Sequence, residues 1–178
     1  MEFIRNIVFV LLVPVITCGQ TVHVDSNRIV YKGIEKVSGV SKDELYARAK
    51  SALLSNTNSA TQTIISDDVD KGMITAKGSI RLASPYHIIK TVEYILELSV
   101  EDGAYKYRID SVYMKQAERG GATKKMSSEE LLKGMDINGP ASAIAEGQLN
   151  EIDMDFQKLL DLVKADMKAS SAVKIRSN

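Results

Sequence analysis

A strict alternation of apolar and polar residues runs through the middle of the chain and limits it to a β-sheet architecture. In Met73–Leu82 every second residue is apolar or small, and segments 86–100 and 105–114 repeat the pattern. The pair Asp102-Gly103 separates the last two segments and is typical of a tight hairpin turn. The pattern therefore predicts antiparallel strands with one buried face and one face in contact with water.

Two more strands and a helix are predicted before these segments. Residues 28–37 and the shorter segment 61–66 are rich in β-branched side chains. Between them, Ser41 and Glu44 stand at the spacing of a capping box, in which both side chains bind free backbone amides. This motif predicts a helix over 41–55 with one apolar face.

A long amphipathic helix is predicted near the C-terminus, over residues 146–169. Its apolar residues recur at helical spacing, and a stripe of this length contacts either the protein's own sheet or a partner. We expect the helix to dock on the sheet beside helix 41–55, with Phe156 near the middle of the contact. The stripe consists of Leu149, Ile152, Phe156, Leu159, Leu160, Val163 and Met167.

The order of these elements predicts an α+β fold. We expect an antiparallel sheet of about five strands, in the order β-α-β-β-β-β-α, with the helices packed on one face. Residues 24–118 form the main domain, residues 119–145 a polar connector with one short helix over 127–133, and residues 170–178 a loose tail. The length of 178 residues suits a single domain.

The first nineteen residues have the pattern of a secretory signal peptide. Arg5 precedes ten uncharged apolar residues at 7–16, and small residues follow up to Gly19. Such a run is too short to span a bilayer, which takes about 20 residues. We expect residues 1–19 to be removed and the protein to be periplasmic or secreted. Alternatively, residues 15–18 resemble a lipobox, and a lipid on Cys18 would then anchor the protein to the envelope, its only membrane contact.

Composition argues against several functions. The chain has 23 Lys and Arg and 23 Asp and Glu, so its net charge is zero and it lacks the basic excess of nucleic-acid-binding proteins. One cysteine and two histidines, His23 and His87, supply few metal ligands or catalytic bases. We therefore expect no catalytic, metal-binding or cofactor-binding residues and no enzymatic activity.

Tyrosines supply the candidate binding residues. The chain has seven tyrosines, three phenylalanines and no tryptophan, and Tyr94, Tyr105, Tyr107 and Tyr113 fall on two adjacent predicted strands. A tyrosine combines an apolar ring with a polar hydroxyl, so these four side chains suit an amphipathic groove. The alternative is that they pack against neighbouring strands within the sheet.

Two strings resemble the opening of a known family. Residues 28–34 (RIVYKGI) and 40–49 (VSKDELYARA) are similar to a bacterial domain of unknown function with a TBP-like fold, domain of unknown function 4468. The resemblance covers roughly residues 24–118. It implies export in Gram-negative bacteria and helices packed on an antiparallel sheet. It brings no catalytic residues, and the TBP-like shape does not imply DNA binding.

These observations lead to two functional hypotheses. The first is an exported, non-catalytic binding domain that holds a small apolar ligand in a groove or pocket between sheet and helix. The second is an envelope assembly module that pairs with another protein through a sheet edge or the C-terminal helix.

Overall fold

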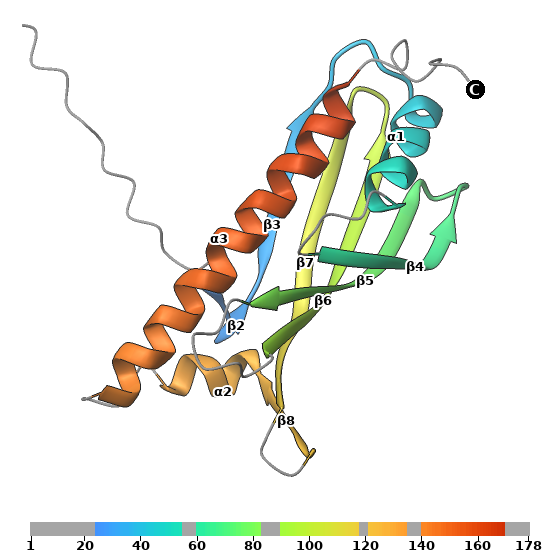
Figure 1. Ribbon diagram of the computed structural model, residues 1–178. Coiled ribbons are helices and arrows are strands. Elements are labelled where there is room, and N and C mark those ends of the chain that lie inside the picture. Colours follow the sequence, from blue (N-terminus) through green and yellow to red (C-terminus); the bar gives the residue numbers. More distant parts are fainter. Residues whose placement is uncertain (1–23, 55–59, 83–89, 118–120, 135–139, 170–178) are drawn as a thin grey trace, which may run out of the picture.

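The computed structural model describes residues 24–54, 60–82, 90–117, 121–134 and 140–169, which form an α+β fold, as predicted (Figure 1). The strands are β1 (Val24–Asp25), β2 (Arg28–Ile29), β3 (Tyr31–Lys36), β4 (Ala60–Asp68), β5 (Met73–Leu82), β6 (Lys90–Glu101), β7 (Ala104–Ala117) and β8 (Thr123–Ser127). The helices are α1 (Lys42–Leu54), α2 (Ser128–Lys133) and α3 (Pro140–Lys168).

Six strands form one antiparallel sheet in the order β3-β7-β6-β5-β4, and β8 pairs with β7 beyond the end of β3. The long strand β7 therefore carries two partners on one edge, while β6 occupies the other. β1 and β2 form a separate two-stranded hairpin. The sheet is larger than the predicted five strands because β8 adds a sixth.

The helices cover one face of the sheet, and α3 runs along its length with α1 beside its C-terminal half (Figure 1). Alternate residues of β5 and β6 point to this face, so that Ile74, Ala76, Leu96 and Leu98 are fully buried. The register places Ile74 opposite Leu98 and Ala76 opposite Leu96, so these side chains pack in cross-strand pairs under the helices.

Helix α1 begins where the sequence predicts because side chains accept its first free amides. The backbone amide of Glu44 donates to Ser41 Oγ over 3.4 Å. The amide of Lys42 donates to Asp102 Oδ1 over 2.8 Å, and Asp102 lies in the hairpin turn between β6 and β7. The turn therefore caps the helix that packs above it.

Helix α3 docks on the sheet through its apolar stripe, as its sequence predicts. The ring of Phe156 is fully buried and meets the rings of Tyr31 and Tyr94 edge to face, with both centroid distances at 5.1 Å. Beside it, the hydroxyl of Tyr31 donates to Asp153 Oδ1 over 2.7 Å, which satisfies a polar group in the core. All seven stripe residues are buried.

The predicted polar connector is wrong for much of its length. Residues 123–127 form β8, which pairs with residues 113–117 of β7, and α2 follows directly, close to the predicted helix 127–133. Helix α3 also starts earlier than predicted, at Pro140. The sequence does not predict β8, because all five of its side chains are exposed or partly exposed and form no apolar pattern. Backbone hydrogen bonds to β7 stabilise this strand instead.

Several predicted features lie outside the described residues. They are the signal peptide 1–19 with Cys18, both histidines and the tail 170–178. Within the described part, no helix combines the length and the apolar character that crossing a bilayer demands.

Candidate functional site: a cleft at the sheet edge

The four candidate tyrosines do not line one groove. Tyr94 and Tyr105 are buried in the core, Tyr107 is partly buried against it, and Tyr113 is partly exposed on the opposite side of the sheet. Helix α3 covers Tyr94 directly through Phe156. For two of them the alternative prediction, packing within the sheet, is confirmed. Tyr94 packs over Gly78 of the neighbouring strand, and Tyr107 packs over Gly33.

A β-bulge in β7 separates Tyr113 from the other tyrosines. Ile95 of β6 pairs with Asp110 and Glu93 pairs with Tyr113, so β7 has one more residue than β6 over this stretch. Ser111, within the bulge, adopts the left-handed region with φ of 52°. The extra residue reverses the alternation, so Val112 and Met114 point into the core and Tyr113 points away from it.

The same bulge marks a break in the sheet edge. Strand β3 pairs with β7 up to Ile109, and β8 begins pairing at Tyr113, so residues 110–112 have no strand partner on this edge among the described residues. A cavity of about 140 Å³ opens at the break. A second hollow of about 340 Å³ adjoins it and shares Arg28, Val30 and Arg108 with it.

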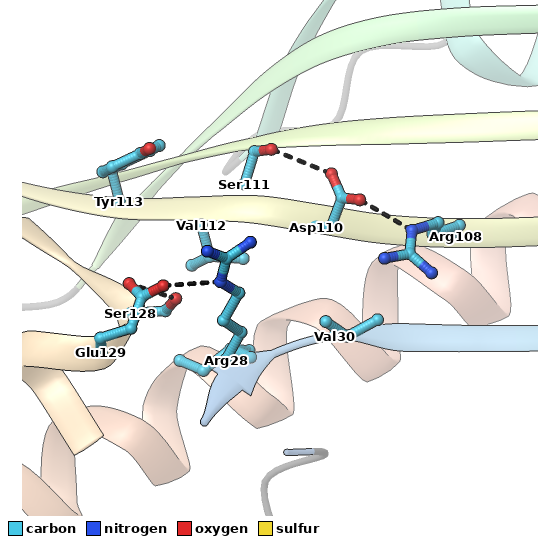
Figure 2. Close-up of a pocket in the computed structure, with 10 residues that line it drawn as sticks. Arg28, Val30, Arg108, Asp110, Ser111, Val112, Tyr113, Ser128 and Glu129 are labelled. Carbon is cyan, nitrogen blue, oxygen red and sulfur yellow. Dashed lines mark hydrogen bonds and ion pairs between the residues drawn. The ribbon is translucent and has the colours of Figure 1, made fainter. Parts of the chain in front are cut away.

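We call the site formed by these two hollows the arginine cleft. Its floor is apolar and buried, and its rim carries the charged groups (Figure 2). Ile29, Val30 and Val112 form the floor, and Arg28, Arg108, Asp110, Ser111 and Glu129 stand around it.

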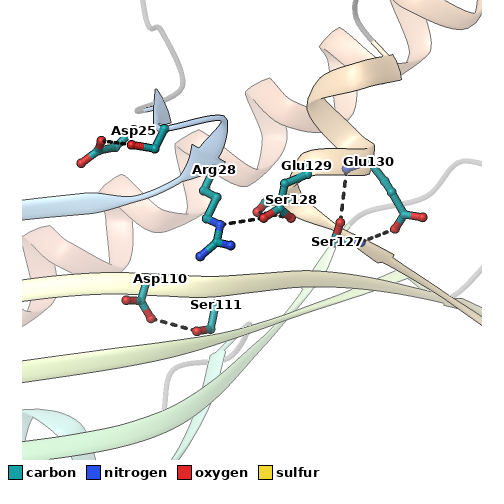
Figure 3. A network of polar contacts seen from close by, with 9 residues as sticks. Asp25, Arg28, Asp110, Ser111, Ser127, Ser128, Glu129 and Glu130 are labelled. Carbon is teal, nitrogen blue, oxygen red and sulfur yellow. Dashed lines mark hydrogen bonds and ion pairs between the residues drawn. The ribbon is translucent and has the colours of Figure 1, made fainter.

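Arg28 reaches the cleft from the β1–β2 hairpin. The turn residues Ser26 and Asn27 both have positive φ, of 52° and 62°, which matches the tight hairpin turn that fits strand twist. Arg28 follows this turn and points into the space between α2 and β7 (Figure 3). Its Nε lies 2.7 Å from Glu129 Oε1 in the first turn of α2.

Arg108 and Asp110 come from β7 itself. Arg108 Nε donates to Asp110 Oδ2 over 2.7 Å, and the Ser111 hydroxyl donates to Asp110 Oδ1 over 3.0 Å. These bonds fix the bulge and keep the guanidinium of Arg108 at the cleft (Figure 2). Both arginines thus form their ion pair through Nε, at one edge of the guanidinium group.

Hydrogen bonds keep the rim charged at neutral pH. The pKa of Glu129 is lowered by hydrogen bonds from its own backbone amide and from Ser127, with a further contribution from Arg28. The hydrogen bond to Asp110 raises the pKa of Arg108. In formal charge, the two arginines balance Asp110 and Glu129, and Asp25 of the adjoining hollow is paired with Lys32 over 2.6 Å, so the charged groups at the cleft balance one another.

This arrangement suits binding of a small polar ligand. Polar and charged side chains make up most of the cleft's lining, and the apolar floor is small. Within the described residues, no cluster of three or more metal-ligating side chains occurs.

Of the residues that line the cleft, only Tyr113 was among the candidates predicted from the sequence (Figure 2). Arg28, Arg108 and Glu129 lie on three separate elements, and each alone has the appearance of an ordinary surface charge. The one local signal was Asp110-Ser111, a pair of small polar residues inside an otherwise regular strand.

Comparison with known proteins places the chain by its fold. The model of a family described as "Domain of unknown function (DUF4468) with TBP-like fold" matches residues 31–115. No curated protein matches the chain.

Two solved structures are similar. A TBP-like protein from Parabacteroides distasonis has a TM-score of 0.66 at 11% identity, and the match covers 84% of this chain and 99% of that one. A DUF4468 family protein from Bacteroides ovatus has a TM-score of 0.64 at 14% identity, with 90% and 95% covered. At such identities the likeness shows the fold alone. Residues 31–115 are therefore similar to the DUF4468 family of domains of unknown function, and the chain has a TBP-like fold.

Proposed function

We propose that this protein is an exported, non-catalytic binding domain whose ligand site is the arginine cleft. The observation that carries the proposal is the break in the sheet edge between β3 and β8, where two arginines border an apolar floor. This site differs from the one predicted from the sequence, which was a groove between sheet and helix. That space is filled, because Phe156 of α3 packs into it.

The cleft is built to keep its shape. Val30 and Val112 belong to the buried floor, and Asp110 is held by Arg108 and Ser111. A preformed site loses little conformational entropy when a ligand binds, which favours affinity even in a small cavity.

Native mass spectrometry of the protein purified from its own cell envelope tests this proposal. We expect a retained small mass in the wild type and its loss in the double variant Arg28→Gln/Arg108→Gln. Lys106→Gln is the matched control, because Lys106 is an exposed cation on the same strand but outside the cleft. A small mass that survives in the double variant would place the ligand elsewhere.

Export rests on the N-terminal pattern. We expect intact-mass analysis of the envelope fraction to find a chain without residues 1–19. A diacylated Cys18 would select the lipoprotein route, and a chain that retains Met1 would contradict export.

One observation favours the second candidate, an assembly module. Strand β4 lies at an edge of the sheet (Figure 1), residues 60–66 carry no charge, and Ile65 is 57% exposed. Edge strands usually carry charges or proline that block pairing with another chain. A co-purifying protein that Ile65→Lys releases would support this candidate. The stripe of α3 cannot serve it, because the stripe is buried on the sheet.

A further inference from the structure

The arginine cleft also indicates the chemical class of its ligand. We propose that it binds a small carboxylate carrying one negative charge, held between the guanidinium groups of Arg28 and Arg108. This inference rests on the proposed function, since it names the ligand of the same cleft.

The first argument is the unused hydrogen-bonding capacity of the arginines. Each guanidinium presents five N–H donors in a planar fork. Among the described residues, the ion-pair partner of Arg28 is Glu129 and that of Arg108 is Asp110, both reached through Nε. The terminal Nη groups therefore remain for another acceptor, and a planar carboxylate matches the geometry of a guanidinium fork.

The second argument is charge. Arg28 and Arg108 are balanced by Asp110 and Glu129 at the rim, and Asp25 adds a further carboxylate to the adjoining hollow. A ligand with one negative charge can contact both arginines at a moderate cost in repulsion. A phosphate with two charges doubles both its attraction to the arginines and its repulsion from the carboxylates, but the cost of removing it from water grows with the square of its charge. The cleft therefore favours a carboxylate over a phosphate.

The third argument is size and lining. The inner hollow, of about 140 Å³, is close to an engineered cavity of about 150 Å³ that admits benzene. Its floor of Ile29, Val30 and Val112 suits a short apolar group attached to the carboxylate. The adjoining hollow gives room for the rest of a ligand the size of an acylated amino acid.

Nuclear magnetic resonance titration of the ¹⁵N-labelled full chain tests the inference, with N-acetyl-alanine as the probe. We expect saturable shifts of the backbone amides of residues 28–30 and 110–113. The neutral N-acetyl-alanine amide should shift them at least about tenfold less at equal concentration, because charged hydrogen bonds are the stronger ones. Inorganic phosphate should bind more weakly than N-acetyl-alanine.

Variants assign the contact to the two arginines. Arg28→Gln and Arg108→Gln should each weaken the probe's binding about tenfold or more, and Arg28→Lys should lie between Gln and wild type, since lysine keeps the charge without the fork. Lys106→Gln removes an equal charge outside the cleft and should leave binding unchanged. Amide spectra that are otherwise superimposable on the wild type show that each variant is folded.

Three results would overturn the inference. They are equal binding of the neutral amide, tighter binding of phosphate, and shifts confined to residues outside the cleft or absent altogether. The proposed function fails separately, when the double variant retains the native small mass.

Discussion

At the residue scale, glycines make room for tyrosine rings within the sheet. Gly78 lies opposite Tyr94 on the neighbouring strand, and a Cβ atom at Gly78 would overlap the ring of Tyr94. Tyr94 cannot move aside, because it is 1% exposed and packs against Phe156. Gly78→Ala should therefore lower the free energy of unfolding by about 1–3 kcal/mol, the usual cost of overpacking, measured by urea denaturation.

A second glycine is the control for this prediction. Gly147 is exposed on α3, and a Cβ atom there meets nothing within 4 Å. Gly147→Ala should raise the free energy of unfolding by about 0.5–1 kcal/mol, because alanine is the better helix former. Equal effects of the two substitutions would show that Tyr94 does not occupy the space over Gly78.

Buried tyrosine hydroxyls predict a loss of stability at alkaline pH. Burial raises the pKa of Tyr94 to about 12, and it also raises the pKa of Tyr105. In the unfolded chain a tyrosine ionises near pH 10, so folding favours the neutral form. The stabilisation is therefore complete below about pH 10 and is lost as the pH rises toward 12.

Urea denaturation across this range, with tyrosinate absorbance, measures the effect. The urea concentration at the midpoint of unfolding should decrease as the pH rises from about 10 to 12. This decrease should be smaller in Tyr94→Phe. Ionisation of all seven tyrosines near pH 10 in a protein that stays folded would contradict the burial of these hydroxyls.

At the element scale, α3 contributes stability through its contact with the sheet. Phe156 is fully buried between Tyr31 and Tyr94, so Phe156→Ala should cost about 3–5 kcal/mol of unfolding free energy. Leu162→Ala, on the same helix at a position 49% exposed, should change it by less than about 0.5 kcal/mol. Urea melts at one low protein concentration compare them. An unchanged midpoint in Phe156→Ala would mean that the helix awaits a partner.

The elements that the sequence predicts are those with an apolar pattern. Strand β5 alternates without interruption and α3 carries a complete stripe, so both are predicted with the correct type and face. Strand β8 has exposed or partly exposed side chains, and its existence depends on the edge of β7. The bulge at Ser111 was also not predicted: the alternation assumed for 105–114 runs through it and places Tyr113 on the wrong face.

At the scale of the whole molecule, the site depends on distant segments meeting. The hairpin with Arg28, strand β7 with Arg108 and helix α2 with Glu129 converge only after β3 and β8 have paired with the same edge. No single segment carries a motif for the cleft, so sequence patterns predict most of the fold but, apart from Tyr113, none of the candidate site.

Zero net charge leads to a prediction about nucleic acid. Equal numbers of acidic and basic residues provide no electrostatic attraction to phosphates, which dominates non-specific binding. On the open face, Glu93 also forms ion pairs with Lys77 and Lys115, at 3.7 and 2.7 Å. Fluorescence anisotropy with a random duplex at physiological salt should show no submicromolar affinity, and such an affinity would contradict this account.

The arginine cleft is the central claim, and a crystal structure of the protein grown with N-acetyl-alanine tests it most directly. We predict electron density for the ligand at the break between β3 and β8, with its carboxylate bonded to the Nη groups of Arg28 and Arg108 and its methyl group over Val30. Density for the ligand on the open face or against β4, with none at the break, would contradict the claim.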